Sequence, residues 1–306
     1  MKRALFLVLA LSVGVFAQAP KTDKSAALPA TPPAYTTMLT EPAQPVTHSD
    51  LYCAGFVTPE RLPRANFVAG GLQTPVQSRF NDREFLYLHG SGFTPGTRVS
   101  IVRELHDPNR YESFPGEKAR LARAGTVYGD IGYAVVIKSG GPDTFIAQVE
   151  FSCEDILAGD LVVPFAERQP VSYRQHSTVD LFPSNETSLS GRIIAARDFD
   201  KYLGTNRKVY LDIGAQSGVK PGDYFRIVRG YRTKDLDATD AASYGQTIQE
   251  DTQKNAPALS AKQRENLPRH VVGEVVVLSA RPTTATAMIT FALEDVHIGD
   301  VVQLEK

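Results

Sequence analysis

The chain of 306 residues has no tryptophan, only two cysteines and no surplus of charge. Its 33 Lys and Arg residues against 34 Asp and Glu give a formal net charge of −1. No basic stripe is therefore available to neutralise a phosphate backbone, and nucleic acid is not expected as a partner. The absence of Trp weakens a role in stacking on sugars. None of the six histidines pairs with another His or a Cys at metal-ligand spacing, so no metal site is predicted.

Long apolar runs are also absent beyond the first residues. Lys2 and Arg3 precede the apolar segment ALFLVLALSVGVFA (residues 4–17), which ends with small residues at Val15 and Ala17. This pattern is typical of a secretory signal peptide, residues 1–17, whereas a membrane-spanning helix needs about 20 apolar residues. An uncleaved anchor is the alternative. We therefore expect an exported protein of the periplasm or outer cell envelope, with no stable membrane span after signal cleavage.

A segment rich in proline, alanine and threonine follows the signal. Six prolines lie between Ala19 and Val46, and few large apolar residues accompany them. A segment of this composition cannot bury enough apolar surface to fold alone. We predict a disordered linker over residues 18–50, which is either a flexible tail or a spacer from a layer of the envelope.

The rest of the chain repeats itself in order. The segment EDILAGDLVV (residues 154–163) recurs as EDVHIGDVVQ (residues 294–303). Two tandem domains follow, residues 51–165 and 188–306, joined by a connector at 166–187. Further matches are GFTPGTRVSIVR (92–103) with GVKPGDYFRIVR (218–229), GYAVVI (132–137) with GEVVVL (273–278), and CAGFVT (53–58) with LSGRII (189–194).

Each repeat is predicted to consist of short strands. The apolar runs are four to seven residues long, rich in Val, Ile, Tyr and Phe, and separated by Gly, Pro, Asp and Asn. Five or six such strands in about 110 residues favour a small closed barrel, since closure removes exposed edges. The predicted fold is all-β, with two tandem small β-barrels after the signal peptide and the Pro-rich linker.

Gly-Asp pairs and related glycines mark the predicted turns. Gly adopts positive φ without steric cost, and an Asp side chain can accept hydrogen bonds from backbone N–H groups of the turn. A catalytic or metal-binding role for the aspartates is the alternative, and we interpret them as structural. The predicted turn residues are Gly96, Gly159, Asp160, Gly222, Asp223, Gly299 and Asp300.

The second domain carries a long polar insert at residues 230–270, about twice as long as its counterpart in the first domain. We predict a surface excursion that is mobile in its middle. Ser260 is a good N-cap and AKQREN favours helix, so a short helix is expected to begin near Ser260 and to stop at Pro268. The insert is either a partner contact or an idle loop.

The second repeat, from GVKPGDYFRIVR (residues 218–229) to LEDVHIGDVV (residues 293–302), resembles the C-terminal β-barrel domain of the flagellar assembly protein T family. It is also similar to tail domains of bacterial envelope proteins that carry peptidoglycan-binding LysM modules. The resemblance implies a non-enzymatic barrel in the periplasm or at the cell envelope. Because the matching motifs are turns and strands, it implies no functional residue.

No catalytic, cofactor-binding or metal-binding residues are predicted, and the chain is not expected to be an enzyme. We expect a secreted scaffold or binding protein whose partner is an envelope protein or a cell-wall polymer. A carbohydrate- or peptidoglycan-binding module is the alternative, and it would need an exposed aromatic row, for which Tyr224, Tyr231 and Tyr244 are candidates. A hydrolase is the least supported alternative, because it would need a His and an acid that converge in a pocket.

Cys53 and Cys153 are predicted to form a disulfide within the first domain. They are the only cysteines, and an exported chain meets an oxidising compartment. In the repeat alignment Cys53 corresponds to Leu189 and Cys153 to Leu293, which suggests two buried positions in contact in both domains. Two buried free thiols are the alternative.

Overall fold

The computed structural model describes residues 36–38, 44–72, 77–172, 174, 178–183, 189–232 and 259–305. The predicted signal peptide, the middle of the long insert and Tyr244 lie outside the described residues. Among the described residues, no helix is long and apolar enough to cross a bilayer.

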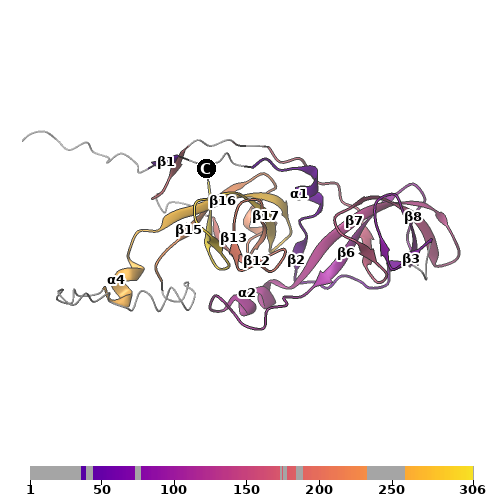
Figure 1. Cartoon of the computed structure of the whole chain (residues 1–306), viewed down its shortest axis with the longest axis horizontal. Coiled ribbons are helices and arrows are strands. Elements are labelled where there is room, and N and C mark those ends of the chain that lie inside the picture. Colours follow the sequence, from indigo (N-terminus) through magenta and orange to yellow (C-terminus); the bar gives the residue numbers. More distant parts are fainter. Residues whose placement is uncertain are drawn as a thin grey trace, which may run out of the picture. The chain divides into compact units, whose positions relative to one another are not determined.

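Two closed barrels of six antiparallel strands form the fold, as predicted (Figure 1). The first has the order β7-β6-β10-β3-β5-β8 and closes through β7–β8 pairing, while the short strand β2 (Phe56–Thr58) extends β7. Its strands are β3 (Phe67–Gly71), β5 (Phe85–His89), β6 (Arg98–Leu105), β7 (Thr126–Ser139), β8 (Thr144–Ser152) and β10 (Leu161–Pro164).

The second barrel has the order β12-β14-β17-β16-β15-β19 and matches the first strand for strand. A two-residue pair accompanies each barrel, β4 with β9 in the first and β13 with β18 in the second. The strands are β12 (Ser190–Ala196), β14 (Lys208–Leu211), β15 (Tyr224–Arg229), β16 (His270–Ala280), β17 (Ala285–Ala292) and β19 (Val301–Leu304); the pairs are β4 (Arg79–Phe80), β9 (Ile156–Leu157), β13 (Tyr202–Leu203) and β18 (Val296–His297), and a 3-10 helix η1 (Ala215–Ser217) follows β14.

Alternating side chains fill each barrel. In β7 the side chains of Ala134 and Val136 are fully buried, whereas the neighbouring Tyr133 is only half-buried. In β16 the corresponding Val275 and Val277 are fully buried. A period of two is what a strand needs to present one face to a core, and the two barrels accordingly have separate hydrophobic cores.

The turn glycines have the positive φ that the Gly-Asp motif suggested. Gly96 and Gly222 have φ of 86° and 90°, and Gly159 and Gly299 have φ of 95° and 104°. In the second barrel the carboxylate of Asp223 accepts a hydrogen bond from the N–H of Lys220 at 2.8 Å. These are turns in which glycine lies at the left-handed position, where a β-carbon would be strained.

The alignment of CAGFVT with LSGRII is wrong. The counterpart of β12 is β3, because Val68 N–H donates to Asp160 O at 2.8 Å as Ile193 N–H donates to Asp300 O at 3.0 Å. The closed ring of the first barrel therefore begins at Phe67 and not at Leu51. The Cys-x-Gly and Leu-x-Gly patterns matched by chance, because one glycine is a weak anchor for an alignment.

The short helix predicted near the end of the insert is confirmed. Helix α4 (Ala261–Glu265) has Ser260 as its N-cap, and the side chains of Ser260 and Gln263 form a capping box. The rest of the predicted excursion, residues 233–258, lies outside the described residues. The counterpart loop of the first barrel contains a helix that was not predicted, α2 (Glu117–Ala124).

The prediction of a disordered linker over residues 18–50 is wrong where the structure describes that segment. Strand β1 (Thr36–Met38) pairs with β11 (Thr178–Asp180) of the connector. Helix α1 (His48–Tyr52) begins after Thr47, whose side chain forms a capping box with Asp50. The amino-acid composition did not predict either element, because both are stabilised by contacts with distant parts of the chain and not by local propensity.

Candidate functional site: the junction of the two barrels

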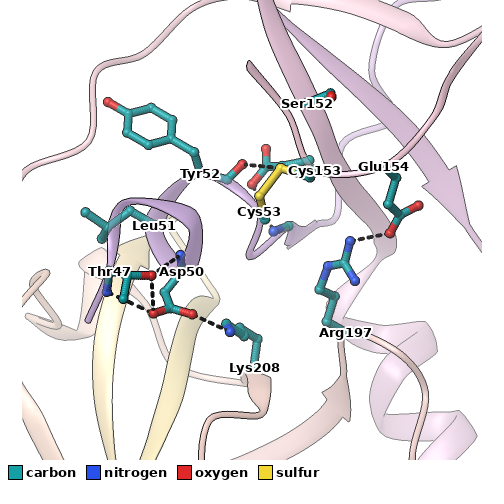
Figure 2. The surroundings of a disulfide bond; sticks show 12 residues. Thr47, Asp50, Leu51, Tyr52, Cys53, Ser152, Cys153, Glu154, Arg197 and Lys208 are labelled. Atoms are coloured by element: carbon teal, nitrogen blue, oxygen red, sulfur yellow. Dashed lines mark hydrogen bonds and ion pairs between the residues drawn. A yellow bond between two sulfur atoms is a disulfide. The ribbon is translucent and has the colours of Figure 1, made fainter. Parts of the chain in front are cut away.

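The segment before the first barrel, residues 44–58, runs along the second barrel, and we call it the strap (Figure 2). Gln44 N–H donates to Thr290 O of β17 at 2.9 Å. Leu51 and Ala54 are buried in a cluster with Val276, Leu278 and Met288 of the second barrel. The strap therefore packs on a domain that it precedes by more than a hundred residues.

The disulfide between Cys53 and Cys153 is confirmed, with 5.5 Å between the Cα atoms. Cys53 follows α1 in the strap, and Cys153 follows β8 of the first barrel. The bond consequently ties the first barrel to a segment that packs on the second (Figure 2). Because Cys53 precedes β3, the first strand of the closed ring, the disulfide joins the strap to the barrel and not two parts of the ring.

Only one of the two cysteines has the leucine counterpart that the repeat suggested. Cys153 N–H donates to Ile131 O and Leu293 N–H donates to Val272 O, each at 2.8 Å, so these positions correspond. Leu189 is not the counterpart of Cys53, because Leu189 precedes β12 and Cys53 precedes the barrel altogether. The repeat therefore gives no basis for a paired contact of Leu189 and Leu293 in the second domain.

Ion pairs accompany the disulfide on both sides of the strap (Figure 2). Asp50 of α1 pairs with Lys208 of β14 at 2.5 Å, and Glu154 of the first barrel pairs with Arg197 of the second. Burial acts to raise the pKa of Asp50, but hydrogen bonds from Lys208 and Thr47 outweigh it and hold that pKa below its ordinary value.

Buried hydrogen bonds join the strap backbone to the second barrel. The Tyr210 hydroxyl donates to Ala54 O at 3.1 Å, and the Thr286 hydroxyl donates to Gly55 O at 2.9 Å. Tyr210 is fully buried, and burial raises the pKa of its hydroxyl. Because an unpaired buried polar group is costly, these bonds specify how the strap lies on the barrel.

Asp130 of β7 connects the strap with the connector. Its carboxylate accepts hydrogen bonds from Gly55 N–H at 2.9 Å and from Arg168 at 2.8 Å. Burial raises the pKa of Asp130, while the charge of Arg168 opposes that shift. Arg168 also donates to Leu51 O at 2.8 Å, so the connector and the strap are fixed to each other.

The loop before α2 makes a further link between the barrels. Phe114 is 1% exposed within the core cluster of the second barrel, and its ring stacks on His297 at 4.8 Å. Lys201 of the second barrel pairs with Asp107 at 2.9 Å and with Glu117 of α2 at 3.1 Å. A side chain of one domain that completes the core of the other makes independent movement costly.

Four half-buried aromatic rings lie beside the disulfide, and we call them the aromatic surface: Tyr52, Tyr133, Phe151 and Phe165. The ring centroids are 5.8 Å apart for Tyr52 and Phe165, 5.1 Å for Tyr133 and Phe165, and 5.5 Å for Tyr133 and Phe151. The guanidinium of Arg98 lies 5.9 Å from the ring centroid of Tyr133. Adjacent aromatic and Arg side chains at a surface are typical of interaction sites.

The second barrel has different residues at the same positions. Tyr133 faces Phe151 across the β7–β8 pair, as Glu274 faces Phe291 across β16–β17. Phe165 follows β10 as Glu305 follows β19, and Arg98 begins β6 as Tyr224 begins β15. The same barrel face is thus aromatic in the first barrel and acidic in the second.

The connector covers this face of the second barrel. The Tyr224 hydroxyl donates to Ser172 O at 2.8 Å and accepts from the Arg174 N–H at 3.0 Å. The Arg174 guanidinium pairs with Glu305 at 2.7 Å and lies 5.5 Å from the Tyr224 ring centroid. Tyr224, a candidate of the sequence analysis, therefore holds the chain's own connector.

A cavity of about 180 Å³ remains between the connector and the acidic face, lined in part by Arg174, Arg226, Glu274 and Phe291. Glu274 is 1% exposed, and Thr290 donates a hydrogen bond to it at 2.7 Å. Burial, together with the nearby charge of Glu305, raises the pKa of Glu274 to about 8. This carboxyl is the most strongly perturbed acid of the second barrel among those described.

The two aspartates of the predicted Gly-Asp turns before β10 and β19 pair with arginines. The carboxylates of Asp160 and Asp300 each accept two hydrogen bonds from an arginine of the neighbouring strand, Arg103 and Arg229. Tyr231 stacks on His270, with 5.8 Å between the ring centroids. The described residues contain no group of three or more His, Cys, Asp and Glu side chains that could hold a metal ion.

The aromatic surface was not predicted from the sequence, because its rings come from four separate segments. One signal was available: Tyr133 and Phe151 fall on repeat positions that hold an acid and a phenylalanine in the second copy. In the comparisons with known proteins, no protein-family model matches the chain. No curated protein matches it either.

Proposed function

We propose that this is an exported, non-enzymatic scaffold or binding protein of the cell envelope, which presents two barrel faces in a fixed arrangement. One observation carries the proposal: the strap packs on the second barrel and is bonded covalently to the first. A rigid body of this kind is suited to holding partners at a defined spacing, because it loses little entropy when it binds them.

Three observations support the cellular location. The first residues have the pattern of a secretory signal, and a structural disulfide is compatible with an oxidising compartment. The resemblance of the second barrel to flagellar assembly protein T and LysM-protein tail domains agrees with an envelope role. The periplasm and the outer envelope are both consistent with these features.

A pull-down from envelope fractions tests the proposal. The full chain, secreted and immobilised through a C-terminal tag, is expected to retain a defined envelope protein. The variant Cys53→Ser with Cys153→Ser is the matched control, because it keeps both barrel sequences and removes the covalent tie. If neither chain retains any protein above a tag-only control, the scaffold proposal is wrong.

A cell-wall polymer is the second candidate partner, and the half-buried rings of the aromatic surface are the observation that favours it. Co-sedimentation with purified peptidoglycan tests this candidate. Binding that is lost in Tyr133→Ala and kept in Tyr111→Ala, whose ring is 85% exposed elsewhere, would assign the surface to the polymer.

A further inference from the structure

We propose that the aromatic surface binds an extended proline-rich peptide, namely residues 18–35 of a second copy of this chain. The inference rests on the proposed scaffold function and names its partner. Residues 18–35 contain four prolines, and residues 25–35 contain no charged side chain. The docking would join successive copies of the chain into an assembly.

The second barrel provides the template for the occupant. Its equivalent face is contacted by the connector, where the Tyr224 hydroxyl bonds to the backbone of Ser172 and Arg174. Farther along the connector follow β11 and Leu181, whose carbonyl accepts a hydrogen bond from Val271 N–H at 3.0 Å. This face of the second barrel therefore binds backbone groups of a peptide segment.

The residues that differ between the two faces define which peptide fits the first barrel. On the second barrel the connector brings Arg174 to Glu305, beside the buried Glu274. On the first barrel Phe165 and Tyr133 take those two positions, and the carboxylate beside them, Glu150, already pairs with Arg98 at 2.6 Å. Aromatic rings favour proline, whose apolar ring and fixed φ suit docking at low entropic cost.

The adjacent segments of the same copy already have contacts. The strap contacts the aromatic surface through His48, whose ring centroid lies 5.0 Å from that of Phe151, and Gln44 farther upstream bonds to β17 of the second barrel. Farther upstream, β1 pairs with β11 of the connector. Since β1 and residues 44–58 are thus engaged within their own copy, a second copy is taken as the source of the docking segment.

Fluorescence anisotropy with a labelled synthetic peptide of residues 18–35 tests the proposal on the full exported chain. We expect saturable binding that weakens at least tenfold in Tyr133→Ala or Phe165→Ala. Tyr111→Ala is the matched control and should bind as the unaltered chain does. Replacing the four prolines of the peptide by alanine should weaken binding by a similar factor.

Photo-crosslinking of the unaltered chain removes any dependence on how the variants fold. A peptide with a photoreactive phenylalanine in place of Tyr35 should crosslink to β7, β8 or the residues after β10. Absence of saturable binding, crosslinks confined to other elements, or affinity unchanged in both ring variants would each refute the proposal.

Two other outcomes can be told apart from peptide binding: glycan binding at the aromatic surface, and failure of the scaffold proposal. If purified peptidoglycan binds in a Tyr133-dependent manner and the peptide does not, the surface is a glycan site and the inference is wrong. The envelope pull-down is a separate readout. It can succeed when the peptide fails, so failure of this inference is distinguishable from failure of the scaffold proposal.

Discussion

A buried Arg–Asp pair occupies the same place in each barrel. Asp160 is 4% exposed, and Arg103 donates to both of its carboxylate oxygens at 2.7 Å. The same carboxylate accepts the Leu157 N–H of the adjacent turn at 2.8 Å. Asp160→Ala removes the acceptor of Arg103 and of the Leu157 N–H, so it should lower the free energy of unfolding by about 1–3 kcal/mol in urea denaturation.

The exposed pair of Arg79 and Asp155 is the matched control. The two side chains are 73% and 40% exposed and lie 2.8 Å apart. Such a pair contributes less than about 1 kcal/mol, so Asp155→Ala should change stability little. Equal losses in Asp155→Ala and Asp160→Ala would show that burial does not decide the contribution of these aspartates.

Glu274 makes stability depend on pH. Burial raises its pKa in the folded chain from the ordinary 4.5 to about 8. Between these values the folded state binds the proton and the unfolded state does not, so the stability present below pH 4.5 is lost as pH rises toward 8. Glu274→Gln removes this loss and should stabilise the chain at pH 8 by on the order of 2 kcal/mol.

Thermal denaturation at pH 5 and pH 8 measures this effect. The gain in Tm from Glu274→Gln should be larger at pH 8 than at pH 5. The exposed Glu60 provides a control, because Glu60→Gln should give the same small change at both values. A gain from Glu274→Gln that does not vary with pH would contradict the assignment of a protonated, buried carboxyl.

At the scale of the element, the turns of the Gly-Asp motif require glycine because of its backbone conformation and not because a side chain would collide with neighbouring atoms. A β-carbon at Gly159 would meet no atom within 4 Å, but φ is 95°. Gly159→Ala should therefore cost about 1–2 kcal/mol through left-handed strain alone. Gly141 is equally open and has no positive φ, so Gly141→Ala should be neutral or slightly stabilising. Chemical denaturation compares the two, and equal effects would rule out strain as the cause.

The strands and turns could be predicted from the sequence because their signals are local and occur twice. Alternation in β6 and β15, glycine in the turns and the N-cap Ser260 all depend on neighbouring residues. The place of Cys53, the insertion of Phe114 into the other core and the aromatic surface depend on how distant segments pack. The spacing of apolar residues does not show which distant segments pack together. The first strand was misaligned because the match of CAGFVT with LSGRII depended on a single shared glycine.

At the scale of the whole molecule, the disulfide and the strap should make the barrels unfold together. The bond closes a loop with a sequence separation of 100, for which the chain-entropy model gives about 4–5 kcal/mol. The double variant Cys53→Ser, Cys153→Ser should lose stability of that order in urea denaturation under non-reducing conditions. A loss below about 1 kcal/mol would mean that noncovalent contacts of the strap already fix the junction.

Differential scanning calorimetry of the oxidised chain tests most directly whether the two barrels form one body. We predict a single transition, in which the calorimetric and van't Hoff enthalpies agree, because unfolding either barrel releases the strap and exposes part of the other core. The cysteine double variant should unfold at a lower temperature. Two resolved transitions in the oxidised chain, at temperatures that the cysteine substitutions leave unchanged, would contradict the account.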